Sequence, residues 1–328
     1  MLSAPRVHSL TNSALSCCDF SFFYLSLPSS TMPQPVPLQR LPYAAPREAF
    51  INALERDGCV IIQNFTDKET LAQARAEVQP YLDAEEKGSS VGALEGQTKT
   101  CTRLIGRSAT VRDKYFSDPL YQALVDHFLT LTTTCWYGTE PSTTVSPPVL
   151  SIGITMDIQP GTPAQRLHRD DKNHHARHAA ASSYDYSSNG SRDVLLGLFV
   201  PGCDTTRANG ATRVVPGSHL WGDERPDFGD DGTKGVVDVA LQVGEAMVML
   251  GSLYHGGGEY SRLDGKSRTM HIMFCCSGVH RQEEISFLSY PIEDVKTYSP
   301  LVQQRLGWKQ SEPNLGWVDL KSPEFLLK

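Results

Sequence analysis

Residues 246–276 read AMVMLGSLYHGGGEYSRLDGKSRTMHIMFCC, two apolar runs joined by a glycine-rich connection. Short apolar runs bounded by Gly, Ser and Asp are typical of buried β-strands. The pattern therefore predicts strands at Ala246–Leu250 and Arg268–Cys276. His255 follows the first strand and precedes three glycines, so its imidazole is expected close to the core.

Short apolar runs separated by turn-forming residues begin at Val149. We expect further strands at Leu150–Ile158, Val194–Val200, Thr212–Val215 and Val236–Val239. Several short strands separated by turn signals predict a β-sandwich or barrel rather than a doubly wound parallel sheet.

The first half of the chain has helical patterning instead. Apolar spacing predicts helices at Ala45–Asp57, Leu71–Leu82 and Asp118–Leu131, with Thr66 as the N-cap of the second and Glu69 completing a capping box. Residues 1–45 are rich in Ser and Pro and are expected to form a tail. We expect one domain over residues 46–328: a helical part to about residue 148, a β core over about 149–280, and a C-terminal tail.

The segment Gln165–Asp170, QRLHRD, holds the strongest chemical signal. His168 and Asp170, two residues apart at a strand end, point to the same side, and His255 is the best candidate for a third donor. Each residue alone has a structural explanation, but two His and one carboxylate on one face are typical of non-haem Fe(II) oxygenases. Zn²⁺ usually takes four ligands or a His₃ set, so iron is favoured.

One class of iron oxygenase uses 2-oxoglutarate, whose distal carboxylate suits the planar, always charged guanidinium of arginine. Arg268 lies at the start of the strand after His255 and is our candidate. Arg262, in the expected turn, is a weaker rival, and Thr212 is a candidate hydroxyl donor to the same carboxylate.

Together these segments resemble the phytanoyl-CoA dioxygenase family. The resemblance runs from about residue 46 to the end and rests on His168-Arg169-Asp170, on NGATRVVPGSH at 209–219, on HGGG at 255–258 and on Arg268. The segments CTRLIGRS at 101–108 and GWVD at 316–319 are similar to its fungal secondary-metabolite branch (verruculogen synthase-like and quinolone-alkaloid dioxygenase-like).

The resemblance implies a mainly β fold with flanking helices, the cupin-like double-stranded β-helix or jelly roll. It implies Fe(II) bound by His168, Asp170 and His255, with Gln165, Thr212 and Arg268 contacting 2-oxoglutarate. It also implies an oxidoreductase that consumes O₂ and 2-oxoglutarate, releases succinate and CO₂, and hydroxylates, desaturates or endoperoxidises a bulky small-molecule intermediate of fungal secondary metabolism.

Two alternatives stay open: a fatty acyl-CoA α-hydroxylase of the phytanoyl-CoA type, and a non-catalytic jelly-roll ligand-binding protein. The polar stretch 171–192 is expected to be a solvated loop or lid. Its Tyr184 and Tyr186 are candidate substrate contacts, and we do not expect His174, His175 and His178 to form a second metal centre.

Composition excludes several classes of function. The 328 residues include 30 Lys and Arg against 37 Asp and Glu, for a net charge of −7. This balance argues against a broad nucleic-acid footprint or a polybasic membrane patch. The eight cysteines form no CxxC pair, which favours reduced thiols and a cytoplasmic protein. A signal peptide around Ala14–Leu27 is weakly indicated, and a homodimer is a plausible assembly.

Overall fold

The computed structural model describes residues 37–84, 98–185 and 192–328, all within the compact unit Pro35–Lys328. Its strands are β1 (Arg40–Pro42), β2 (Cys59–Gln63), β3 (Lys99–Cys101), β4 (Leu131–Tyr137), β5 (Glu140–Ser146), β6 (Val149–Ile158), β7 (Leu195–Pro201), β8 (Thr212–Val214), β9 (Val237–Asp238), β10 (Ala246–Leu250), β11 (His255–Gly257) and β12 (Arg268–Cys276).

Its α-helices are α1 (Arg47–Asp57), α2 (Lys68–Ala84), α3 (Leu104–Arg107), α4 (Pro119–Leu129), α5 (Ser286–Ser289), α6 (Ile292–Lys296) and α7 (Pro300–Gln303). Short 3₁₀ or π segments are η1 (Val111–Phe116), η2 (Asp170–His174), η3 (Arg207–Asn209), η4 (Ser218–Leu220), η5 (Gln304–Trp308) and η6 (Pro323–Leu327). No described helix is long and apolar enough to cross a bilayer.

A seven-stranded sheet in the order β1-β2-β10-β7-β12-β6-β3 forms the main layer. Side chains alternate between its faces because the side-chain period of a strand is two. On β10, for example, Met247 and Met249 join one apolar cluster, whereas Val248 and Leu250 join the other. The sheet is therefore buried on both faces.

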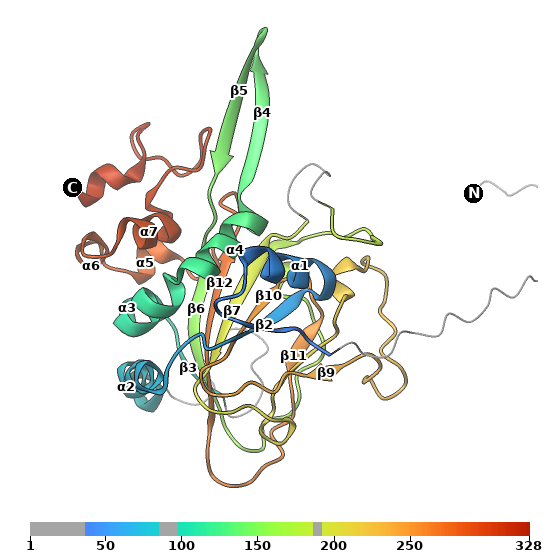
Figure 1. Ribbon diagram of the computed structural model, residues 1–328. Coiled ribbons are helices and arrows are strands. Elements are labelled where there is room, and N and C mark those ends of the chain that lie inside the picture. The colour runs from blue at the N-terminus through green and yellow to red at the C-terminus, as the bar shows by residue number, and fades with distance from the viewer. Residues whose placement is uncertain (1–36, 85–97, 186–191) are drawn as a thin grey trace, which may run out of the picture. The chain divides into compact units, whose positions relative to one another are not determined.

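A three-stranded sheet, β11-β8-β9, lies against the face of the main sheet that carries Met247 and Met249. We call this the inner face and the opposite one the outer face. Val214 on β8 packs in the same cluster as Phe199, Met247 and Met270 of the main sheet. Helices α1, α2 and α4 cover the outer face, where their apolar side chains share a cluster with Val60 and Val248 (Figure 1). The protein is thus mainly β with flanking helices, and the two sheets form the double-stranded β-helix that the resemblance implied.

The six predicted strands are confirmed. The bounds of β10 and β12 are those predicted, and β6, β7, β8 and β9 differ from prediction by one residue at one or both ends. The predicted N-cap Thr66 is wrong: α2 begins at Lys68, and the side chain of Asp67 accepts the backbone N–H of Thr70 at 2.7 Å. The expected C-terminal tail carries α5 to α7, which lie beside α3 (Figure 1).

The sequence did not predict the hairpin of β4 and β5, which projects from the sheets (Figure 1). Its side chains are mostly exposed, including Trp136 at 68% and Tyr137 at 63%. One hydrogen bond ties the hairpin to a segment distant in sequence: the side chain of Glu312 accepts the backbone N–H of Val145 at 2.9 Å.

His271, on the outer face of β12, makes the fold sensitive to acid. Burial, and to a smaller extent the positive charge of Arg75, lowers its pKa from 6.5 to about 4. As pH falls from 6.5 to 4, the unfolded chain takes up the proton first, so stability falls across this window, by on the order of 3 kcal/mol at its acid end.

We expect His271→Gln to reduce this dependence, because an amide keeps a partner for Thr155, whose hydroxyl lies 2.8 Å from the imidazole, and does not titrate. Urea unfolding of both proteins at pH 7 and pH 4.5 measures the effect. The control His175→Asn removes an exposed imidazole and should leave the pH dependence unchanged. Equal acid sensitivity of His271→Gln and the native protein would contradict this assignment.

Candidate metal centre

His168 and His255 are brought together by backbone pairing. The N–H of each donates to the carbonyl of the other at 2.9 Å, an isolated antiparallel bridge beside β11. Facing residues of such a bridge place their side chains on one face of the sheet. Their ring centroids are 4.7 Å apart. Residues 87 positions apart in sequence therefore present neighbouring imidazoles.

Asp170 completes the group. Its Oδ1 lies 3.4 Å from Nε2 of His168 and its Oδ2 lies 3.2 Å from Nε2 of His255. One potential ligand atom from each residue lies within 4.8 Å of the others, and this is the group of potential metal ligands found in the part of the chain that the structure describes. The spacing is that of three donors around one ion.

Hydrogen bonds fix which nitrogen of each ring is available. Nδ1 of His168 lies 2.7 Å from the Arg166 carbonyl, and Nδ1 of His255 lies 3.1 Å from the Leu253 carbonyl. A carbonyl only accepts, so each Nδ1 carries a proton, and each Nε2 faces Asp170 and is the nitrogen that a metal ion would take in place of a proton. Orienting second contacts of this kind are typical of metal-binding histidines.

The charge at the centre favours a cation. Burial works to raise the pKa of Asp170, but the positive charge and hydrogen bonds of the two histidines outweigh it and hold the pKa well below its ordinary value. The side chain of His168 is 43% exposed and that of Asp170 is 21% exposed. The carboxylate is therefore ionised, as a metal requires, and one side of the group is open.

Arg268 lies on the inner face of β12, the face it shares with Met270 and Ile272. It is 4% exposed, and its Nε donates to the carbonyl of Asn209 at 2.9 Å. Burial lowers its pKa to about 10. No ion pair to Arg268 occurs among the described residues, and a buried charge without a counter-ion indicates a site for an anion.

The NGAT segment supports this arginine. Asn209 accepts the N–H of Thr206 through its side chain at 2.7 Å, which leaves its carbonyl for Arg268. Gly210 has a φ of +75°, and a Cβ there would lie 2.7 Å from the carbonyl oxygen of Gly258. Only glycine fits this close approach. The rival Arg262 has a side chain 52% exposed and pairs with Asp264 at 2.8 Å.

Gln165 and Thr212 meet at Gly257. Oε1 of Gln165 accepts the backbone N–H of Gly257 at 2.6 Å, and Thr212 is the register partner of Gly257 in the β11–β8 pair. Both residues are half-buried. The structure thus places Thr212 on the small sheet that carries His255, Gln165 beside it and Arg268 on the main sheet; their roles stay predictions.

Arg169 is a residue of the centre that sequence reasoning did not single out. It lies between two ligand candidates but is buried, donating to the carbonyls of Ser218 at 2.7 Å, Trp221 at 3.0 Å and Gly222 at 3.1 Å. Its guanidinium carbon lies 4.4 Å from the ring centroid of Tyr254. Chain alternation, which points Arg169 away from His168 and Asp170, was the available signal.

The predicted solvated loop after Asp170 is only partly correct. His178 is buried, and its Nε2 lies 2.6 Å from Oδ2 of Asp171, which is fully buried. Tyr184 donates to Asp193 at 2.7 Å and packs edge-on to Phe128, so its substrate role stays a prediction. Tyr186 lies outside the described residues.

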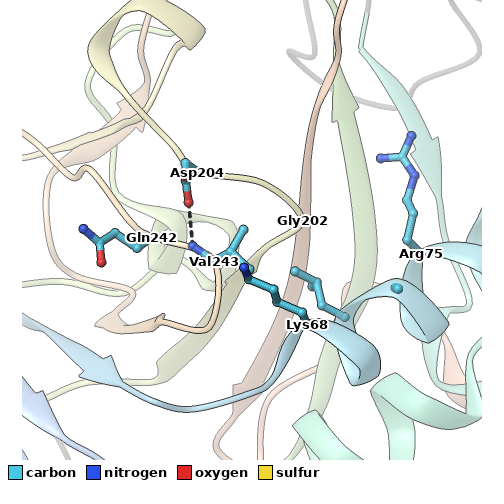
Figure 2. A pocket seen from close by; sticks show the side chains of 8 residues that line it. Lys68, Arg75, Gly202, Asp204, Gln242 and Val243 are labelled. Carbon is cyan, nitrogen blue, oxygen red and sulfur yellow. Dashed lines mark hydrogen bonds between the residues drawn. The ribbon is translucent and has the colours of Figure 1, made fainter.

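A cavity of about 570 Å³ lies elsewhere, lined by residues of α2 and by two loops near the ends of β7 and β10. Figure 2 shows Lys68 reaching toward Val243, whose backbone N–H is bonded to Asp204 at 2.7 Å. None of the three metal-ligand candidates lines this cavity. Its size therefore does not make it the site of the chemistry.

Comparison with known proteins agrees with this geometry. The sequence matches the family described as Phytanoyl-CoA dioxygenase (PhyH) over residues 54–264. It is 35% identical over 284 residues to the dioxygenase himG of Aspergillus japonicus, covering 84% of this chain and 85% of himG. It is 32% identical over 281 residues to the dioxygenase peniF of Penicillium patulum, covering 85% and 88%.

Among solved structures, the fold resembles the non-heme alpha ketoglutarate dependent epimerase SnoN from nogalamycin biosynthesis, with a TM-score of 0.51 and 19% identity. The likeness covers 74% of this chain and 88% of SnoN. At that identity it shows the fold alone. The family match spans more than half of the chain, and the curated relatives are matched over most of their length. The chain therefore belongs to the phytanoyl-CoA dioxygenase family.

Proposed function

We propose that the protein is an Fe(II)- and 2-oxoglutarate-dependent dioxygenase that oxidises a bulky, largely apolar small molecule of fungal secondary metabolism. The observation that carries the proposal is the convergence of His168, Asp170 and His255 on one point. Two imidazoles and a carboxylate leave open coordination positions and suit Fe(II). A structure of SnoN contains Fe³⁺ and alpha ketoglutarate, which supports this choice.

Each group of this chain has a defined task. His168, Asp170 and His255 hold the ion, which when bound supplies the means to activate O₂. Arg268 receives the distal carboxylate of 2-oxoglutarate, where a buried guanidinium gains the anion it lacks among the described residues. Gln165 and Thr212 meet at Gly257 and orient the co-substrate. Succinate and CO₂ leave as products.

The inner face of β6 favours an apolar substrate. Ile152, Ile154 and Met156 belong to or pack against the inner apolar cluster, and Ile152 and Met156 are only half-buried. Hydroxylation, desaturation and endoperoxidation are all open to such a site. The choice among them follows from how the substrate is held.

A fatty acyl-CoA is the second candidate substrate. It would need basic groups for the CoA phosphates, and the acidic chain gives it little support. A vestigial, ligand-binding jelly roll is a further alternative, and the complete donor set weighs against it.

The assay that tests the proposal is succinate formation. We expect the Fe(II)-loaded protein to convert 2-oxoglutarate to succinate, with a large stimulation by one member of a library of fungal metabolites and a matching mass change in that metabolite. Hydroxylation would add 16 mass units, desaturation would remove two, and endoperoxidation would add 32. No succinate with any member, in protein that binds Fe(II), would contradict catalysis and favour the ligand-binding alternative.

We also propose a homodimer and a cytoplasmic location. The exposed aromatic side chains of the β4–β5 hairpin, Trp136 and Tyr137, support a contact with a second copy. Buried thiols at Cys59, Cys275 and Cys276 support a reducing compartment.

A further inference from the structure

Glu283 lies near the metal centre, on the connection that follows β12. It follows β12 in a connection that crosses back over β6. There the Glu284 N–H donates to the Ser151 carbonyl at 2.9 Å, and the Glu283 N–H contacts the Ser151 hydroxyl at 3.3 Å. This docking holds Glu283 against the start of β6 at Ser151.

Two neutral groups hold its carboxylate. Ser151 donates to Oε1 at 3.0 Å, and the side-chain amide of Asn173 donates to Oε2 at 3.1 Å. Asn173 lies three residues after Asp170 in the 3₁₀ segment η2. Side chains at i and i+3 eclipse in a 3₁₀-helix, about 6 Å apart along its axis. The carboxylate is therefore about one turn from a metal-ligand candidate.

The charge of Glu283 is not balanced by the protein. Within the residues that the structure describes, no lysine, arginine or histidine forms an ion pair with it. Burial raises the pKa of its carboxyl group, and the negative charge of Asp170 adds to the rise, while the Ser151 and Asn173 hydrogen bonds oppose it. The residue as a whole is exposed, so a cation from outside can reach this carboxylate.

The neighbouring Glu284 shows the contrast. It accepts the backbone N–H of Arg103 at 2.9 Å and the hydroxyl of Tyr290 at 3.1 Å, and the positive charges of Arg103 and Arg107 act on it. Glu284 therefore fastens the connection to α3. Glu283, one residue earlier, instead contacts Ser151 and Asn173 near the metal centre.

Apolar side chains follow Ser151 along β6. Ser151, which holds the carboxylate, directly precedes Ile152 on β6, and Ile154 and Met156 follow on the same inner face. A ligand that complements both the Glu283 carboxylate and the apolar inner face of β6 has an apolar skeleton and one positive charge.

We propose that Glu283 is a specificity-determining residue that selects substrates carrying a protonated amine, while the inner face of β6 contacts their apolar skeleton. The proposal rests on the proposed function and narrows its substrate class to basic, alkaloid-like molecules. It also disfavours acyl-CoA substrates, whose negative charges Glu283 would repel.

The test uses matched probes with the Fe(II)- and 2-oxoglutarate-loaded protein under anaerobic conditions. The probes are tryptamine and 1-adamantylamine, with tryptophol and 1-adamantanol as neutral counterparts and 1-adamantanecarboxylate as the anion. Calorimetry at pH 7 measures their dissociation constants. A charge-assisted hydrogen bond predicts that each amine binds about tenfold more tightly than its alcohol, and that the anion binds more weakly than either.

Glu283→Gln should abolish the amine preference, because the amide keeps the shape but loses the charge. Glu284→Gln, the matched control, should retain it. Equal binding of amine and alcohol by the native protein, absence of amine binding, or a preference that persists in Glu283→Gln would each overturn the proposal. Fe(II) and 2-oxoglutarate binding, measured first on the same samples, distinguishes this failure from failure of the proposed function.

Discussion

Replacement of His168 with alanine is expected to abolish Fe(II)-dependent succinate formation. Two donors remain, Asp170 and His255, and the ion loses the ligand whose ring faces His255 at 4.7 Å. Loss of a group that merely orients a metal ligand commonly costs about 10–100-fold, so loss of the ligand itself should exceed about 100-fold in turnover and in metal affinity. Metal analysis after dialysis and the succinate assay measure the two effects.

The control for this experiment is His175→Asn, which removes an exposed imidazole five residues from Asp170. His175 has a φ of +56°, a conformation that asparagine tolerates better than most residues. We expect this variant to keep its iron and its activity. Undiminished turnover in His168→Ala would refute the ligand assignment, and equal loss in both variants would show that the effect is not specific to the centre.

Arg268→Met is expected to raise the KM for 2-oxoglutarate by about a hundredfold or more. Removing one partner of a buried, hydrogen-bonded charge pair typically costs about 2–5 kcal/mol, and each 1.4 kcal/mol is about tenfold. Arg268→Lys should recover little of this loss, because an ammonium does not reproduce the two-pronged geometry of a guanidinium. Initial rates over a range of 2-oxoglutarate concentrations measure the change.

The matched control is Arg262→Met, because Arg262 is the rival that the sequence offered and the structure pairs it with Asp264 at 2.8 Å. Its KM should stay within about twofold of the native value, as expected for an exposed ion pair. Iron content should be unchanged in both variants. A normal KM in Arg268→Met, or a large rise in Arg262→Met, would show that Arg268 is not the residue that binds the distal carboxylate of 2-oxoglutarate.

The sequence predicted the parts of the fold whose signal is local. Strands β10 and β12 are continuous apolar runs with clear ends, and their predicted bounds match the structure. The grouping of His168, Asp170 and His255 also followed from residue type, spacing and family resemblance. These predictions needed no knowledge of which loops pack together.

Other features depend on contacts that no local pattern reveals. The β4–β5 hairpin is rich in threonine and serine and buries little, so it lacks the apolar face that identifies a strand. The N-cap of α2 is Asp67 rather than Thr66. Both residue types cap helices well, so the sequence alone could not distinguish them. Glu283 meets Ser151 across 132 positions, and Arg169 meets Trp221 across 52; both roles required the folded chain.

We expect His168, Asp170 and His255 to bind one Fe(II) ion. A crystal structure of the anaerobic Fe(II) complex, with anomalous data collected at the iron edge, tests it most directly. We expect one strong peak about 2.0–2.2 Å from Nε2 of both histidines and from an oxygen of Asp170, a range typical of first-row metal bonds to nitrogen and oxygen. A peak at other residues, or a fully loaded ion that contacts fewer than all three, would contradict it.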